Sequence, residues 1–148
     1  MRFPFALCGL LAAMAAGGAQ ALEYKSVGPD PVIAYDAPAV KGARVYAVPR
    51  GMPIEVVFTN GDWTKVRDSA GSLFWLESKN LTPKRTLVVK VANAKIHAAA
   101  DDGSPLAFTA DKGVLLDMAE PASSGWVKVK HRDGQTGYVK SSEVWGSD

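Results

Sequence analysis

Short runs of apolar and β-branched residues alternate with turn-forming residues throughout positions 22–148. In the first half these runs occupy positions 24–27, 32–35, 44–48, 54–59, 63–67 and 73–77, separated by Gly, Pro, Asn and Asp. The second half has similar runs at 86–92, 106–108, 114–118, 126–130 and 136–140. Short β-prone runs between turn signals predict strands, and no stretch of this region has a convincing helical period. The pattern therefore predicts an all-β fold.

A tryptophan-centred pattern occurs twice in the chain. In each copy a Trp, at 63 and at 126, is followed by Lys two residues later and by Val three residues later. A Gly follows the Trp by eight residues, and an aromatic–aliphatic pair begins four residues after that Gly. Self-similarity at a spacing of 63 residues indicates a repeated structural unit. We therefore expect two small β-modules, at 22–84 and 85–148, with positions 81–85 as their connector.

The hairpins that precede the two Trp strands have different turn signals. Asn60-Gly61 is a strong two-residue hairpin signal, because both residues accept positive φ. In the second copy the corresponding loop is expected over positions 121–125, one residue longer than in the first.

We expect Trp145, just after the last strand, to pack on its own module or on the other one.

Strand periodicity predicts which way each Trp points. Side chains alternate between the two faces of a strand. Val127 and Val129 therefore share one face, and Trp126 lies on the opposite face with two lysines. The same alternation places Trp63 opposite Val66. An aromatic side chain on an otherwise polar face is a candidate contact surface.

The first 21 residues have the pattern of a secretory signal. Met1-Arg2 precedes an apolar run over 3–16, and small residues end the segment at Ala21. The run is shorter than the roughly 20 apolar residues that span a membrane. We expect cleavage after Ala21, no membrane insertion afterwards, and a periplasmic location, with secretion as the alternative.

Charge and cysteine content narrow the classes of partner. The sequence has 17 basic and 15 acidic residues, and removing Arg2 with the signal leaves 16 against 15. This balance argues against nucleic acid, which selects a strongly basic face. The single cysteine, Cys8, lies inside the signal, so the mature chain is expected to have neither disulfides nor thiolate ligands.

Segments of four kinds together resemble those of bacterial SH3-like (SH3b) domains. They are the tyrosine segment 34–37, the Gly-Asp-Trp and Gly-Trp steps at 61–63 and 125–126, the segment 134–139, and the basic-Gly steps at 50–51 and 112–113. The resemblance implies two tandem, five-stranded, partly open β-barrels. It also implies binding and not catalysis, because such modules often recognise cell-wall peptides or protein partners.

The resemblance assigns an aromatic groove to each copy. Tyr35, Trp63 and Trp75 would form the groove of the first copy, and Trp126 and Tyr138 would contribute to the second. The alternative is that these aromatics only cap the barrels or pack between modules. The second copy departs from the pattern, since positions 96–99 stand where the tyrosine segment stood and lack its aromatic. In the first copy Phe74 replaces a patterned Gly, so backbones there are expected to approach less closely.

No catalytic, metal or cofactor site is expected from the remaining residues. His97 and His131 are the only histidines, and with no cysteine in the mature chain they are interpreted as surface residues. No nucleophile elbow or phosphate-binding Gly-rich loop occurs. The sequence therefore favours a non-catalytic envelope protein that binds peptidoglycan or cell-wall peptides. The alternative is a periplasmic adaptor for Pro-rich or extended protein segments.

Overall fold

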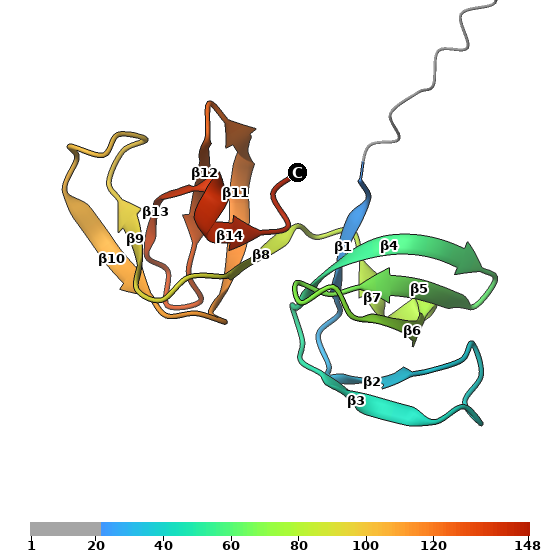
Figure 1. The fold of residues 1–148 in the computed structure, drawn as a ribbon. Coiled ribbons are helices and arrows are strands. Elements are labelled where there is room, and N and C mark those ends of the chain that lie inside the picture. The colour runs from blue at the N-terminus through green and yellow to red at the C-terminus, as the bar shows by residue number, and fades with distance from the viewer. Residues whose placement is uncertain (1–21) are drawn as a thin grey trace, which may run out of the picture.

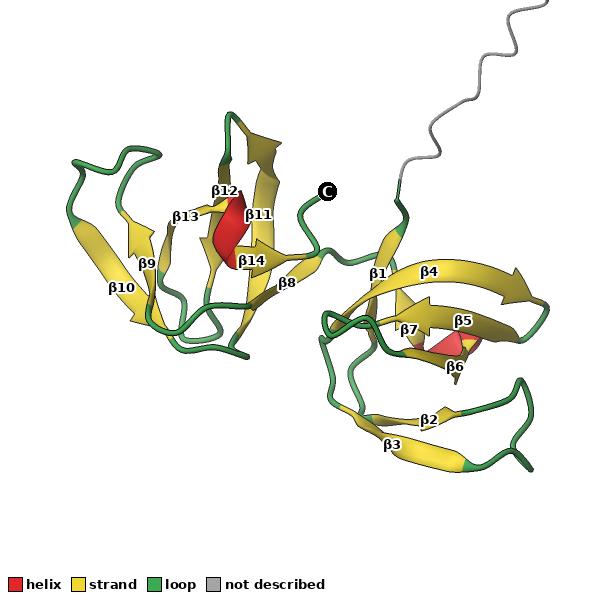
Figure 2. Ribbon diagram, in the orientation of Figure 1, coloured by secondary structure: helices red, strands yellow, loops and turns green. Residues whose placement is uncertain are grey.

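The computed structural model describes residues 22–148, so the expected signal segment 1–21 lies outside the described residues. The described chain is built almost entirely of strands and forms two modules side by side, joined by one short connection (Figures 1 and 2). Each module contains one antiparallel sheet of seven strands and a single-turn 3-10 helix. The prediction of an all-β fold in two tandem modules is confirmed.

The first module forms a sheet with strand order β3-β2-β6-β5-β4-β1-β7. Its strands are β1 (Tyr24–Val27), β2 (Val32–Tyr35), β3 (Arg44–Val48), β4 (Pro53–Asn60), β5 (Trp63–Arg67), β6 (Leu73–Glu77) and β7 (Leu81–Thr82), with the 3-10 helix at Ser78–Asn80. The predicted hairpin between β4 and β5 is present, and Gly61 has a φ of 59° in its turn. Asn60 does not have the expected positive φ: it ends β4 and pairs with Trp63, so the two turn residues are Gly61 and Asp62.

The second module repeats this order as β10-β9-β13-β12-β11-β8-β14. Its strands are β8 (Thr86–Val89), β9 (Ala94–His97), β10 (Leu106–Ala110), β11 (Leu115–Ser123), β12 (Trp126–Lys130), β13 (Thr136–Lys140) and β14 (Val144–Trp145), with the 3-10 helix at Ser141–Glu143. Each module has seven strands, more than the five that the resemblance implied. Each sheet gains its opening strand and a two-residue strand after the 3-10 helix, which pair with one another.

The expected loop at 121–125 is also wrong, because β11 continues to Ser123. Register shifts between Met118 and Glu120 and between Glu120 and Ser123 absorb the extra residues as bulges. Only β12 pairs with this part of β11, so Pro121 can occupy it without losing a hydrogen bond to a second neighbour. The turn therefore shortens to Ser124 and Gly125, which both have positive φ.

Each module has its own apolar core on the inner face of its sheet. The alternation predicted for the Trp strands is confirmed: Thr64 and Val66 are buried in β5, and Val127 and Val129 are buried in β12. The first core contains Val27, Ala34, Val48, Ile54, Val66, Phe74 and Leu76. The second contains Leu87, Val89, Ala94, Ile96, Ala110, Leu116, Val127, Val129, Val139 and Val144.

The modules contact one another through the segment that joins them. The Thr86 hydroxyl donates a hydrogen bond to the Gly51 carbonyl oxygen across the junction (2.7 Å). Trp145 packs edge-to-face on Tyr24 of the first module, with ring centroids 5.3 Å apart. At Gly146 a φ of 109° and a Cβ position 3.0 Å from the Thr86 carbonyl oxygen leave room only for glycine. The expected packing of Trp145 on the other module is therefore present.

Candidate functional site

Aromatic side chains gather on the outer face of the first sheet. Tyr35 and Trp63 meet edge-to-face, with ring centroids 5.4 Å apart and planes at 90°. Trp75 pairs in register with Tyr35 of β2 and with Lys65 of β5, and its ring lies 6.4 Å from that of Phe58. The three residues assigned to the first groove thus lie on neighbouring strands of one face.

Trp63 also forms one wall of an open cleft of about 600 Å3. The opposite wall is the loop between β2 and β3, at positions 38–41. Asp36 fixes this loop, since its Oδ1 accepts a hydrogen bond from the Ala43 amide at 2.8 Å. The charged residues Asp62, Glu77 and Lys79 complete the lining. The cleft therefore presents an indole bordered by charges of both signs.

The second module has an aromatic ring in the position of Tyr35, and that ring is His97. His97 pairs in register with Tyr138 of β13, just as Tyr35 pairs with Trp75 of β6. Its imidazole meets Trp126 edge-to-face at 5.4 Å and 89°, and only 8% of the residue is exposed. The interpretation of His97 as a surface residue, and of the second groove as lacking its aromatic partner, is wrong.

An ion pair spans the second module at the place where the first module has its open cleft. Lys140 Nζ lies 2.8 Å from Asp102 Oδ1 and 5.9 Å from the centre of the Trp126 ring. The hydrogen bond from Lys140 lowers the pKa of Asp102, and the same bond raises the pKa of Lys140. Asp102 belongs to the loop between β9 and β10, so this pair ties the loop to the strand that faces it.

The equivalent position in the first module carries the opposite charge. Glu77, which lies 63 positions before Lys140, ends β6 as Lys140 ends β13. Its carboxylate is 3.3 Å from Lys79 Nζ, on the same side of the cleft. In the described residues no ion pair joins Glu77 to the 38–41 loop. The first cleft is therefore open, whereas the second is bridged.

Tyr138, the last of the residues assigned to the second groove, is half-buried. Lys128 Nζ lies 6.0 Å from its ring centre, and the ring of Tyr138 does not pair with that of Trp126. His131 pairs with Asp133 at 3.0 Å in the turn between β12 and β13.

The sequence analysis missed Phe58, which is 56% exposed beside Trp75. A register shift between Val56 and Phe58, which periodicity does not reveal, turns this side chain outward.

Within residues 22–148, no group of three or more His, Cys, Asp or Glu side chains is placed to hold a metal ion. None of the helices described is both long and apolar enough to cross a membrane. The chemistry that the outer face offers is aromatic stacking combined with charged and hydrogen-bonding groups.

Comparison with known families agrees with the strand order and the repeated Trp segment. The family model for the bacterial SH3 domain matches twice, at residues 28–83 and 90–146. This chain belongs to the bacterial SH3 domain family. Each match falls within one module and covers every strand of its sheet except the opening one, β1 or β8. None of the curated proteins matches the chain.

Solved structures of similar fold include NlpC2 and NlpC1 from Trichomonas vaginalis and an NlpC/P60 family protein from Bacillus cereus. The sequence identities are 14%, 15% and 12%, and the TM-scores are 0.40, 0.40 and 0.38, respectively. The matches cover 84%, 88% and 82% of this chain. They cover 48%, 48% and 55% of those proteins, so the chain spans about half of their length.

Proposed function

We propose that this chain is an exported, non-catalytic binding protein of the cell envelope that recognises peptidoglycan or cell-wall peptides through its first module. The open cleft beside Trp63, in a module of the bacterial SH3 family, is the observation that carries the proposal. An indole face stacks on the apolar face of a sugar or peptide, and polar groups around it fix the orientation. Export rests on the signal pattern at positions 1–21.

The charges around the cleft suit a ligand that carries both amino and carboxylate groups. Asp62 and Glu77 can accept hydrogen bonds from an ammonium group, and Lys41 and Lys79 can donate to a carboxylate. Cell-wall peptides combine such groups with apolar side chains. The second module would add affinity through effective concentration once its Asp102–Lys140 bridge opens.

A co-sedimentation assay with purified sacculi tests the proposal. The mature chain, residues 22–148, is expected to be retained, and Trp63→Ala is expected to lower retention about two- to tenfold through lost stacking. Glu77→Lys places in the first module the charge that bridges the second, so it is also expected to lower retention. Asp111→Lys makes the same charge change at an exposed turn of the second module and serves as the matched control.

Thermal unfolding of each variant shows whether the module remains folded. Absence of retention of the wild-type chain at both low and high salt would contradict the proposal. Equal losses in Glu77→Lys and Asp111→Lys would assign retention to overall charge and not to the cleft.

The second candidate function is a periplasmic adaptor for Pro-rich or extended protein segments. Phe58 is 56% exposed and Val57 is 42% exposed, and Phe58 continues the aromatic face at Trp75. Exposed apolar side chains next to one another mark protein contact sites. Affinity capture from an envelope extract, with wild type, Trp63→Ala and Phe58→Ala compared, tests this function. An identical set of captured proteins for all three would rule out both aromatic positions as the docking surface.

A further inference from the structure

A separate cleft of about 530 Å3 lies between the two modules. One wall is the turn between β3 and β4, at Arg50 and Gly51, and the other is the turn between β12 and β13, at positions 130–132. The segment that joins the modules forms its floor, where Lys84 and Thr86 line the cleft. Residues of both modules are therefore needed to build it.

Contacts at the junction hold the two walls in place. The Thr86 hydroxyl donates to the carbonyl oxygen of Gly51, which itself lines the cleft. Behind the floor, the Arg85 guanidinium lies 5.1 Å from the centre of the Tyr24 ring, and Tyr24 packs on Trp145. These contacts join both modules to the linker. The cleft is thus a preformed feature of the pair of modules.

Positive charge is concentrated around this cleft. Four permanent cations and one carboxylate line it, a net charge of +3, compared with +2 for the whole sequence. Lys84 pairs with the carboxylate of Asp117 at 3.2 Å. In the part of the chain that the structure describes, Arg50, Lys130 and Arg132 make no ion pair within 4.0 Å. Three exposed cations therefore remain available to a ligand.

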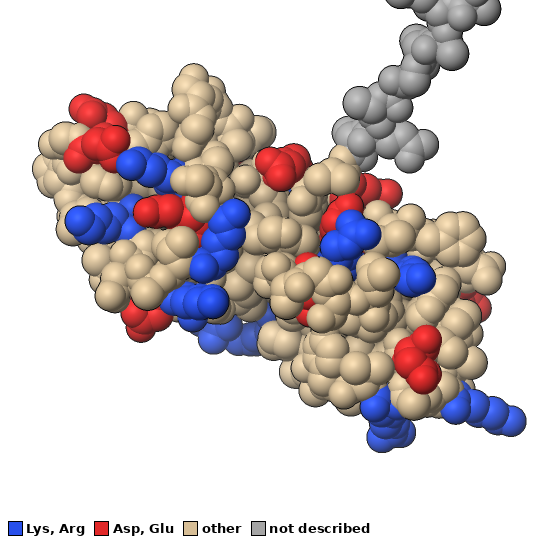
Figure 3. Space-filling model, viewed as in Figure 1, with Lys and Arg blue, Asp and Glu red and all other residues tan. Residues whose placement is uncertain are grey.

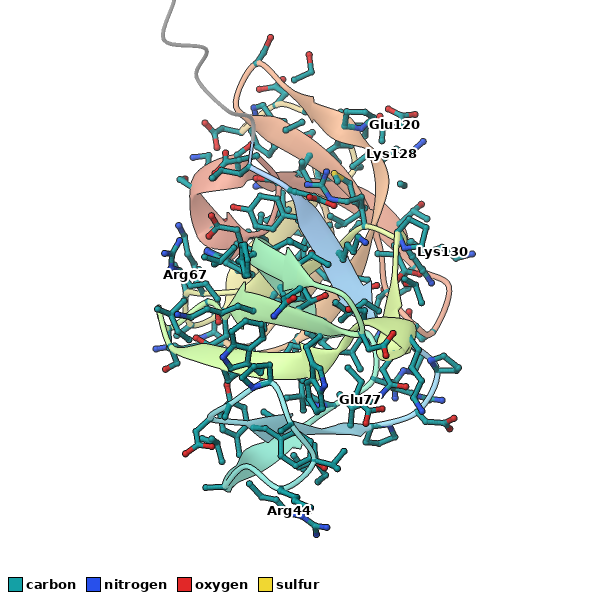
Figure 4. The ribbon with its side chains drawn as sticks, turned by 90° about the vertical axis from the view of Figure 1, so that its right-hand side faces the viewer. Arg44, Arg67, Glu77, Glu120, Lys128 and Lys130 are labelled. Atoms are coloured by element: carbon teal, nitrogen blue, oxygen red, sulfur yellow. The ribbon has the colours of Figure 1, made fainter. Side chains whose placement is uncertain are left out.

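Figures 3 and 4 also show positively charged side chains near the junction of the two modules. In Figure 3, Lys and Arg side chains gather along the lower edge of the second module, where it approaches the first. Figure 4 shows Lys130 extending outward beside the segment that joins the modules. The unpaired cations are exposed, and they line the cleft from both walls.

The rest of the lining indicates the class of ligand. Pro29 and Leu115 contribute apolar surface, and the hydroxyls of Ser26 and Thr82 already hydrogen-bond each other at 3.0 Å. A bare inorganic anion would leave the apolar part of the lining unused. A nucleic acid would need a longer basic track than a cleft of this size provides. The volume falls within the range of pockets that hold a few residues of peptide.

We propose that the cleft between the modules binds an acidic peptide segment, whose carboxylates pair with Arg50 on one wall and with Lys130 and Arg132 on the other. Apolar side chains of the segment pack on Leu115 and Pro29. Arginine binds carboxylates in bidentate geometry, so the two arginines fix the orientation of the peptide. This site is independent of the aromatic cleft beside Trp63, and neither proposal requires the other.

Binding of a defined probe tests the proposal. The probe is a capped, fluorescently labelled pentapeptide of alternating glutamate and leucine, titrated into the mature chain. Anisotropy is expected to show saturable binding, and amide resonances of Gly51 and Arg132 are expected to shift in NMR spectra. The variant Arg50→Gln/Arg132→Gln removes one cation from each wall and is expected to weaken binding about tenfold or more.

A matched control separates the cleft from general charge attraction. Lys95→Gln/Lys112→Gln also removes two exposed cations, and Lys112 occupies in the second module the turn position of Arg50. This control is expected to bind the probe within about twofold of wild type, because neither lysine lines the cleft. The glutamines keep most of each side chain, and unchanged thermal unfolding shows that the variants are folded.

Three results would overturn the proposal. The first is that Arg50→Gln/Arg132→Gln and Lys95→Gln/Lys112→Gln weaken binding of the probe equally. Another is equally tight binding of the uncharged glutamine–leucine peptide. The third is perturbation of Gly51 and Arg132 by inorganic phosphate or by a short single-stranded DNA, with no perturbation by the acidic peptide. Loss of probe binding in Arg50→Gln/Arg132→Gln with sacculus retention unchanged would support this site and leave the proposed function intact.

Discussion

A hydrogen bond between Tyr46 and Asp68 joins β3 to the turn between β5 and β6 in the first module. The Tyr46 hydroxyl donates to Asp68 Oδ2 at 2.8 Å, and Asp68 Oδ1 accepts from two amides of the turn at 3.0 and 2.9 Å. In the second module Phe108 and His131 occupy these positions, with ring centres 6.1 Å apart. The second module thus has a contact between two rings where the first has a hydrogen bond.

The structure allows the contribution of this bond to be estimated. A hydrogen bond to a charged acceptor contributes about 1.5–3 kcal/mol. Tyr46 is only half-buried, so we expect Tyr46→Phe to lower the free energy of unfolding by about 1.5 kcal/mol. Asp68 is 8% exposed, and Asp68→Ala removes all three bonds, with an expected loss of about 3 kcal/mol. The coupling energy in the double-mutant cycle is expected to be about 1 kcal/mol.

Urea unfolding of the mature chain, followed by tryptophan fluorescence, measures these differences at neutral pH. The double variant Tyr46→Phe/Asp68→His copies the pair of the second module and is the control for packing. If Tyr46→Phe changed the free energy of unfolding by less than about 0.5 kcal/mol, or if the coupling energy were zero within error, the estimate would be refuted.

The same bond predicts a dependence on alkaline pH. Burial, together with the hydrogen bond to Asp68, raises the pKa of Tyr46 above its ordinary value of 10.0. A group whose folded-state pKa is raised stabilises the fold below the unfolded pKa, and this stabilisation is lost as pH rises above it. We therefore expect the wild-type chain to lose stability above pH 10, and Tyr46→Phe to lose less over the same range. Parallel curves for the two proteins would contradict this expectation.

Three further variants test other parts of the fold. Gly137→Ala would place a Cβ 2.5 Å from a side chain and 2.7 Å from a carbonyl oxygen of β9, so urea unfolding should show a loss of about 2–3 kcal/mol. Ser141→Ala removes a buried hydroxyl that has no hydrogen-bond partner in the described residues, and should raise the unfolding free energy by about 1 kcal/mol. Lys140→Ala breaks the exposed pair with Asp102, and should speed amide hydrogen exchange in the 98–105 loop while changing global stability by less than about 1 kcal/mol.

The sequence predicts the strands and their faces well, because these depend on local alternation. Each Trp strand places two alternating residues in its core, and that pattern is visible in five consecutive letters. Phe74 fits the expected departure as well: it is buried and packs edge-to-face on Tyr46 at 4.9 Å, whereas Gly137 lies against β9. A large side chain in one copy and a close backbone approach in the other fill the same place.

Features that depend on pairing between distant segments could not be predicted. The role of His97 follows from its register with Tyr138, and matching the two copies from their Trp residues places this segment one residue away. The bulges that turn Phe58 outward and extend β11 are likewise set by their partner strands. The basic cleft could not be found from composition, because the overall charge is nearly balanced and the cations of the two walls are brought together by the junction.

The charge difference beside the two Trp residues lies at strand ends that the cores leave free. Most inner positions carry Val or another apolar residue in both copies, although Thr64 is buried where the second copy has Val127. The end of the sixth strand points outward in both, and there Glu77 leaves the cleft beside Trp63 open while Lys140 reaches Asp102 over Trp126. The charge at the strand end and the carboxylate in the facing loop together decide whether an ion pair ties the loop down, at little cost to the fold, since the 38–41 loop has no carboxylate. Two copies of the same module thus have one open cleft and one that an ion pair bridges.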